Sequence, residues 1–226
     1  MSRRAAVPAA IPESVRDAVS RETLDDLICL VTELDIWQNA KNLVGGKTLD
    51  DVWTRHIADS LQLRHHAPEA RRWLDLGSGA GLPGLVIAIM LKHENAGSDS
   101  AGGDADPGPM VHCVESNARK CAFIRHVARL TAAPVRVHNA RIEDVIADFV
   151  GRVDVVTARA LAPLPKLLDW TSPLLTTGVM GLFPKGDRAE IELTESFKCW
   201  RFDNEISPSI SDPRGRILRI TGLKPA

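Results

Sequence analysis

From residue 73 onward the chain alternates short apolar runs with amphipathic runs, and this alternation limits its fold more than any other feature. The expected strands cover residues 73–76, 111–114, 135–137, 153–156 and 179–183. The expected helices cover residues 82–91, 118–130, 142–149 and 164–175. Strands and helices that take turns in this way are typical of an α/β protein with a doubly wound, parallel sheet. The apolar residues Ile206 and 216–220 predict an antiparallel pair that closes the sheet.

Helical spacing also precedes the first expected strand. Apolar residues recur every three to four positions from residue 12 to residue 37, which predicts two amphipathic helices, and a third helix is expected over 48–63. Three parts follow from this pattern. They are a disordered lead over residues 1–12, a helical segment over 13–66 that packs on the larger domain, and an α/β domain over 67–226.

One stretch interrupts the alternation. Residues 94–108 are rich in glycine, serine, alanine and aspartate, and they carry four acidic residues without a lysine or arginine. Connections between a helix and a strand in α/β units usually have about 2–6 residues. We therefore expect a flexible, acidic insertion here.

Composition excludes several classes of protein. The formal net charge is −1, and the four cysteines are scattered without a Cys-x-x-Cys pair, so neither a disulfide framework nor a metal site is expected. No apolar run reaches the roughly 18 residues that a membrane span requires. The first residues are broken by Pro8, and we do not expect them to form a signal peptide. We expect a cytoplasmic protein with no metal and no membrane contact, and no feature demands an oligomer.

A glycine-rich loop, Gly77-Ser78-Gly79-Ala80-Gly81, lies between the first strand and its helix. It differs from a dinucleotide-binding G-x-G-x-x-G because the third glycine would fall on Leu82. Asp75 precedes the loop, and Glu115 ends the next strand, where a carboxylate meets ribose hydroxyls in doubly wound sheets. Residues 139–144 follow the third strand and can reach an adenine. This order favours S-adenosylmethionine as the cofactor.

Longer motifs connect the chain with a known family. They are Asn42-Leu43-Val44, Trp53 to Leu61 (WTRHIADSL), Leu74 to Gly84 (LDLGSGAGLPG), Glu115 to Ile124 (ESNARKCAFI), Arg141 to Asp144 (RIED) and Thr157 to Ala160 (TARA). With these motifs the chain resembles the glucose-inhibited division protein B family, whose members methylate guanine N7 in 16S ribosomal RNA. The resemblance spans residues 38–186. It departs in the acidic insertion and at Thr157, where the family commonly has serine.

The resemblance implies a Rossmann-like class I methyltransferase fold, with helices before a mostly parallel, seven-stranded sheet. It also implies cofactor contacts at Gly77, Leu82, Ile142, Glu143 and Arg159. The loop and strand-end pattern adds Asp75, Gly79, Gly81 and Glu115 to this set.

The sequence lacks the motifs that other kinds of base methylation require, which is consistent with methylation at N7. Guanine N7 carries a lone pair and no proton, so no general base is needed. The Asn/Asp-Pro-Pro-aromatic motif of amino methyltransferases is replaced by Thr157-Ala158-Arg159-Ala160 after the fourth strand. Methylation of pyrimidine C5 needs a cysteine nucleophile. Cys113, inside a strand, and Cys121, on a helix, are better explained as core residues.

Arg159 and His56 are the candidate catalytic residues. Arg159 ends the fourth strand and faces the expected substrate crevice, where it could hold the cofactor or donate to guanine O6. An ion pair with Asp154 or Glu143 is the structural alternative. The resemblance favours His56 at the entrance of the site. Arg55 has Asp59 four residues on, which equally predicts an ion pair on a helix surface.

RNA contact is expected from a local basic region. Residues 111–166 carry nine Lys/Arg and five Asp/Glu, a net charge of +4. The expected RNA-binding residues are Arg55, Arg119, Lys120, Arg125, Arg129 and Lys185. For the residues of the 118–130 helix, a solvated helix face is an equally good interpretation.

Other functions stay open on the sequence alone. A methyltransferase of the same fold with a different substrate would share the glycine loop and both acids. A non-catalytic, ribosome-associated binding protein would keep the fold without the chemistry. A nicotinamide dehydrogenase is disfavoured by the glycine spacing.

Overall fold

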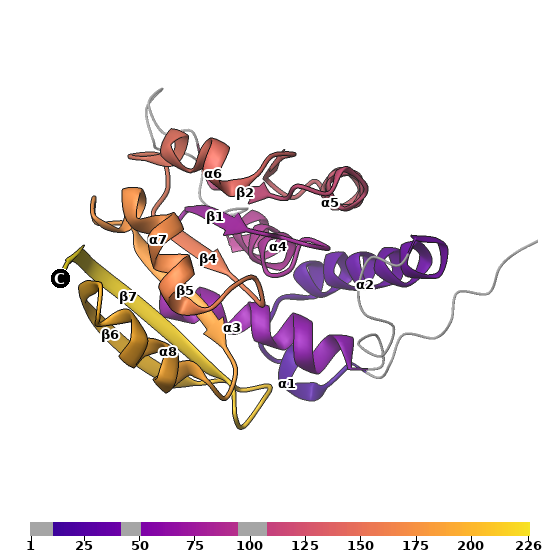
Figure 1. The fold of residues 1–226 in the computed structure, drawn as a ribbon. Helices are drawn as coiled ribbons and strands as arrows, with labels where there is room; N and C mark the ends of the chain where they lie inside the picture. The colour runs from indigo at the N-terminus through magenta and orange to yellow at the C-terminus, as the bar shows by residue number, and fades with distance from the viewer. Residues whose placement is uncertain (1–10, 42–50, 95–107) are drawn as a thin grey trace, which may run out of the picture.

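A seven-stranded sheet runs through the computed structural model, which describes residues 11–41, 51–94 and 108–226 (Figure 1). Its strand order is β3-β2-β1-β4-β5-β7-β6. The strands are β1 (Arg72–Leu76), β2 (Met110–Val114), β3 (Val135–His138), β4 (Val155–Ala158), β5 (Met180–Lys185), β6 (Trp200–Pro208) and β7 (Arg216–Pro225). β1 to β5 are parallel, and β7 pairs antiparallel with both β5 and β6. The expected parallel sheet and its antiparallel closing pair are therefore confirmed.

Helices precede the sheet and connect its strands. They are α1 (Glu13–Arg16), α2 (Arg21–Lys41), the π-helix η1 (Val52–Ala58), α3 (Asp59–His66), α4 (Gly84–Glu94), α5 (Ala118–Thr131), α6 (Ile142–Val145), the short 3₁₀ helix η2 (Ile146–Phe149), α7 (Leu164–Leu175) and α8 (Ala189–Ser196). One hydrophobic cluster contains buried residues of α2 to α5, and a second contains those of α6 to α8. The sheet thus has a helical layer and a hydrophobic core on each face.

The helices before β1 share their core with the sheet. Leu27 and Leu34 of α2 belong to the same cluster as Trp73 of β1 and Leu85 of α4, and all four side chains are almost completely buried. The N-terminal helices therefore pack on the α/β domain as expected. No helix of the described segments is long and apolar enough to cross a membrane.

The helix expected over 48–63 is confirmed as an α-helix from Asp59 onward, but the described part before it is of another type. Residues 52–58 form a π-helix, and an α-helix begins only at Asp59. The buried pair Val52 and Trp53 is followed five residues later by the buried pair Ile57 and Ala58. This spacing matches the i→i+5 turn of a π-helix, and such turns are frequent at functional sites.

Several expected boundaries move and one helix was missed. β4 begins at Val155 instead of residue 153, and just before it the Asp154 carboxylate accepts hydrogen bonds from the main-chain N–H groups of Arg71 and Arg72. Glu94 ends α4 and pairs with Arg64 at 2.8 Å, so it is not part of an insertion. α8 was not expected from the sequence. The remainder of the insertion, at 95–107, the lead at 1–10 and the motif at 42–44 lie outside the described residues.

Replacing Leu27 by alanine should destabilise the whole protein. Its side chain is fully buried in the shared cluster, and removing it from a packed core costs about 2–5 kcal/mol. The matched control is Ile36→Ala on the same helix, where the side chain is 50% exposed and the expected change is within about 0.5 kcal/mol. Urea unfolding followed by fluorescence and circular dichroism should give one transition. Two transitions, of which only one moves, would show that the helices fold separately.

Candidate cofactor and substrate site

The loop after β1 turns tightly at the carboxyl end of the strand. Gly77, Gly79 and Gly81 have φ angles of +63°, +58° and +81°, a region that L side chains rarely adopt. A Cβ atom on Gly77 would also lie 2.5 Å from Leu161 Cδ1. The Ser78 N–H donates to the main-chain oxygen of Val114 in β2 at 3.1 Å. The loop is thereby fixed between β2 on one side and the segment around Leu161 on the other.

A first cavity of about 380 Å³ opens beside this loop. Four of the residues expected to bind the cofactor line it: Gly77, Glu115, Ile142 and Glu143. Lys120, expected to bind RNA, also lines it, as does Trp170, which sequence reasoning missed. The expected residues Asp75, Gly79, Gly81 and Leu82 lie in β1 and in the turn that leads to α4, and Arg159 lines a different cavity.

Glu115 occupies the carboxyl end of β2. Its Oε2 accepts the Gly79 N–H at 2.9 Å, and its Oε1 accepts the Asn117 N–H at 2.8 Å. An ionised carboxylate has about four acceptor positions, so it can still accept two ribose hydroxyls. The carboxylate therefore supports the glycine loop and suits the ribose of a nucleoside in the same cavity.

Asp75 lies fully buried under the loop. Its Oδ2 accepts the Gly84 N–H at the start of α4 at 3.0 Å, and its Oδ1 has no partner among the described residues. Burial is the main cause that raises the pKa of Asp75 to about 7. An ammonium group near Oδ1 would stabilise the ionised form. The amino-acid end of S-adenosylmethionine carries such a group, and these residues fit that cofactor.

A second cavity of about 520 Å³ adjoins the first. Ala160 and Leu161 line both cavities, so the segment after β4 forms their shared wall. Ala160 has a φ of +51°, a strained conformation for a residue other than glycine. The next turn is held by Lys185, whose Nζ donates to the main-chain oxygen of Ala162 at 2.6 Å.

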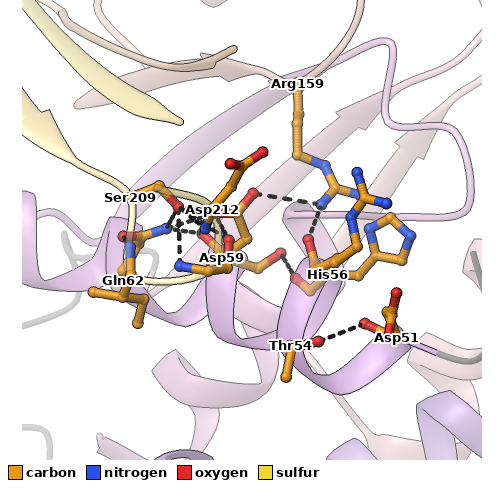
Figure 2. A network of polar contacts seen from close by, with 12 residues as sticks. Asp51, Thr54, His56, Asp59, Gln62, Arg159, Ser209 and Asp212 are labelled. Atoms are coloured by element: carbon orange, nitrogen blue, oxygen red, sulfur yellow. Dashed lines mark hydrogen bonds and ion pairs between the residues drawn. The ribbon is translucent and has the colours of Figure 1, made fainter. Parts of the chain in front are cut away.

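Arg159 lies on the second cavity, next to the π-helix (Figure 2). Its Nη1 donates to the main-chain oxygen of Arg55 at 3.2 Å and lies 3.9 Å from Asp59 Oδ2. The ion pair that the sequence suggested with Asp154 or Glu143 is wrong in its partner. Asp154 pairs instead with Arg72 at 2.7 Å.

His56 also lines the second cavity. Both of its ring nitrogens are buried without a hydrogen-bond partner among the described residues. Burial, with the charges of Arg159 and Arg55, lowers its pKa to about 4. A neutral imidazole at pH 7 therefore offers one N–H donor and one acceptor to a ligand.

The expected helix-surface pair between Arg55 and Asp59 takes another form. The Asp59 carboxylate turns to Gln62, Ser209 and Ser211, whose side chains donate to its Oδ1. Arg55 lines the second cavity through the π-helix. Sequence reasoning missed the two serines, because nothing in the spacing connects residues this far apart in the chain.

The basic residues expected to bind RNA divide into two groups. Arg119, Arg125 and Arg129 of α5 are exposed. Lys185 instead faces the second cavity with a side chain that is 8% exposed, and it pairs with Glu192 at 2.9 Å. The expectation of a surface phosphate contact at Lys185 does not match this buried, paired position. Among the described residues no group of three or more His, Cys, Asp or Glu side chains could hold a metal ion.

Comparison with known proteins decides the family. The family model described as rRNA small subunit methyltransferase G matches residues 23–216. The chain belongs to this family. A ribosomal RNA small subunit methyltransferase G from Methylorubrum populi is 56% identical over 205 residues, which are 91% of each chain. The protein of the same name from Caulobacter vibrioides is 45% identical over 223 residues, covering 95% of this chain and 96% of its own.

Solved structures show the same fold at low sequence identity. An O-methyltransferase from Bacillus cereus has a TM-score of 0.58 at 14% identity, covering 95% of this chain and 98% of that one. A methyltransferase from Geobacter sulfurreducens has a TM-score of 0.59 at 13% identity, covering 90% and 99%. The Rossmann-like methyltransferase fold implied by the sequence is confirmed for this member of the rRNA small subunit methyltransferase G family.

Replacing Gly77 by alanine should weaken cofactor binding. The new Cβ would meet Leu161 at the cavity wall, and overpacking of this kind costs about 1–3 kcal/mol, so we expect roughly ten-fold lower affinity for S-adenosylhomocysteine. The matched control is Gly151→Ala, which has a similar φ of +71° but open space around its Cβ and lines neither cavity. Calorimetric titration should show normal affinity for the control. Equal affinity in both variants would contradict this position for the cofactor.

Asp75 should make folding stability depend on pH. Its carboxyl has an ordinary pKa of 3.8 when unfolded and about 7 when folded, so between these values the unfolded chain releases a proton that the folded chain retains. The free energy of unfolding of the wild type therefore falls from about pH 4 to about pH 7. Asp75→Asn lacks this effect and should gain stability relative to the wild type from pH 5 to pH 7. Urea titrations in which the two proteins' free energies of unfolding differ by the same amount at every pH would contradict this prediction.

Proposed function

We propose that this protein transfers the methyl group of S-adenosylmethionine to N7 of a specific guanine in 16S ribosomal RNA. The observation that carries the proposal is the wall of Ala160 and Leu161, which separates the two cavities. One cavity has the features of a nucleoside site, and the other is lined by Arg159 and His56. Membership of the rRNA small subunit methyltransferase G family supports the reaction and the substrate.

The cofactor residues have distinct roles in this proposal. Glu115 accepts hydrogen bonds from the ribose, and Ile142 and Glu143 contact the adenine. The loop glycines and Leu82 bring the main chain close to the ligand, and Asp75, which is buried and lines neither cavity, supports the amino-acid end indirectly through the loop. When bound, S-adenosylmethionine supplies an electrophilic methyl group on a sulfonium.

The protein's main task is to position the base. Guanine presents N7 and O6 as acceptors on one edge, and N7 must stay free to attack. The Arg159 guanidinium and the neutral His56 ring, both on the second cavity, can donate to O6. Because N7 carries no proton, no base is required. Orientation and distance can supply much of the rate acceleration.

RNA binding is proposed for the exposed face of α5. Arg119, Arg125 and Arg129 lie there, and Lys120 lies between this face and the first cavity. Arg55 lines the second cavity from the π-helix. Phosphate contacts of this kind strengthen binding without reading the sequence. We further propose that the protein acts as a monomer in the cytoplasm, on 16S rRNA or the small ribosomal subunit.

The test is methyl transfer from labelled S-adenosylmethionine to 16S rRNA and to small subunits, followed by mass analysis of nucleosides. One 7-methylguanosine per RNA is expected. Arg159→Ala should slow transfer by about 100-fold, because a displaced base loses its alignment. Charge reversal of Arg125 and Arg129 together should raise the KM for RNA and leave kcat unchanged.

A different label pattern would overturn the proposal. Label in protein or in a small molecule that survives ribonuclease would favour a methyltransferase with another substrate. Cofactor binding without transfer to either RNA would favour a non-catalytic binding protein. Label in a nucleoside other than 7-methylguanosine would retain the RNA substrate and reject the N7 reaction.

A further inference from the structure

Polar side chains join the start of α3 to the loop between β6 and β7 (Figure 2). Asp59 Oδ1 accepts hydrogen bonds from Ser209 Oγ at 2.9 Å and from Ser211 Oγ at 2.7 Å. Asp59 and Ser209 are 150 residues apart in the sequence. Hydrogen bonds to an ionised carboxylate are stronger than those between neutral groups. These contacts fix both the loop and the carboxylate.

Gln62 completes this connection. Its Nε2 donates to Asp59 Oδ1 at 2.6 Å, and its Oε1 accepts the Ile210 N–H at 3.0 Å. Within the loop, the Ser209 N–H donates to the main-chain oxygen of Gly215 at 3.0 Å. The loop over 209–215 is therefore closed by its own hydrogen bonds and docked on α3 by side chains.

The second oxygen of Asp59 faces the substrate cavity. Oδ2 lies 3.9 Å from Arg159 Nη1, and both side chains are mostly buried. Arg159 lies close enough to Arg55 and His56 for charge interactions, and a neighbouring guanidinium repels it. Asp59 supplies the nearest opposing charge. Without it, Arg159 would keep only the weaker attraction of Asp75 against the repulsion of Arg55 and the cost of its own burial.

We propose that Asp59 is a positioning residue that holds the Arg159 guanidinium against the second cavity, and that the 209–215 loop fixes Asp59 for this purpose. The proposal rests on the proposed function, because it assigns Asp59 to base methylation at the same site. Arginine has many rotamers, and productive geometry requires that a functional side chain be held by its neighbours. Asp59 does not act as a base, because its Oδ1 accepts three donors and its Oδ2 faces a cation.

Two substitutions separate charge from docking. Asp59→Asn keeps an oxygen for the two serines but removes the charge, and Ser211→Ala keeps the charge but removes one donor. Asp59→Asn should lower kcat by about 10- to 100-fold, the range expected for a group misplaced by about 1 Å, with KM for RNA within about three-fold. Ser211→Ala should lower kcat several-fold. Asp59→Glu should restore part of the rate.

The matched control is Glu205→Gln. It removes the carboxylate of another ion pair, in which Arg219 Nη1 lies 2.6 Å from Glu205 Oε1, but the glutamate side chain is 67% exposed and lines neither cavity. Its kcat should equal that of the wild type. A purely structural role for Asp59 would lower thermal stability and leave kcat per folded molecule unchanged, which would overturn the proposal.

A second readout does not depend on RNA. Nitrogen NMR of the Arg159 side chain reports rotation of its guanidinium, which should be slow in the wild type and faster in Asp59→Asn. Unchanged rotation would overturn the proposal even if rRNA methylation were confirmed. A wild type that fails to methylate rRNA would reject the proposed function, while slow rotation that depends on Asp59 would still support the positioning role. If Asp59→Asn does not fold, the same measurement on Ser211→Ala decides.

Discussion

The hydrogen bond from the Gly84 N–H to the buried Asp75 carboxylate is the contact on which the rest of the site depends. It joins the end of β1 to the start of α4, an almost wholly buried helix at the centre of one core. A Cβ on Gly84 would lie 2.8 Å from Asp75 Oδ2, so the helix reaches this position only with glycine there. The connecting loop must then turn within a few residues, which explains its positive φ angles. The cofactor cavity is built on this turn.

The segment after β4 lies between the cofactor cavity and the substrate cavity. The Leu161 side chain lies close to Gly77, and together with Ala160 it separates the two cavities. A strained Ala160 persists because the following turn is held by Lys185 and because Glu192 accepts the Leu164 N–H at 2.7 Å. The side chains of Lys185 and Glu192 thus fix the conformation of the segment that separates the two cavities. A cofactor on one side and a base on the other would meet where this wall ends.

The sequence was most informative where local pattern and position in the sheet agree. Alternating apolar runs predict the parallel order, and strand ends place Gly77, Glu115 and residues 142–143 around one cavity, because the carboxyl ends of parallel strands share an edge. It was least informative where contacts between side chains far apart in the sequence determine the structure. The burial of Lys185 depends on Glu192 of a helix that has little local signal, and the docking of the 209–215 loop depends on Asp59. The π-helix was missed because a spacing of five was interpreted with an α-helical period.

The central claim is that the cofactor and a guanine bind on the two sides of one wall, with N7 toward the methyl group. A compound that joins guanosine N7 to the 5′ carbon of adenosine through a short chain, in place of the sulfonium, tests this directly by its dissociation constant. We expect this compound to bind at least about 100-fold more tightly than S-adenosylhomocysteine, as for analogues that resemble a transition state. The same compound joined through guanine N1 should lose this gain. Equal affinity for both compounds and for S-adenosylhomocysteine would contradict the account.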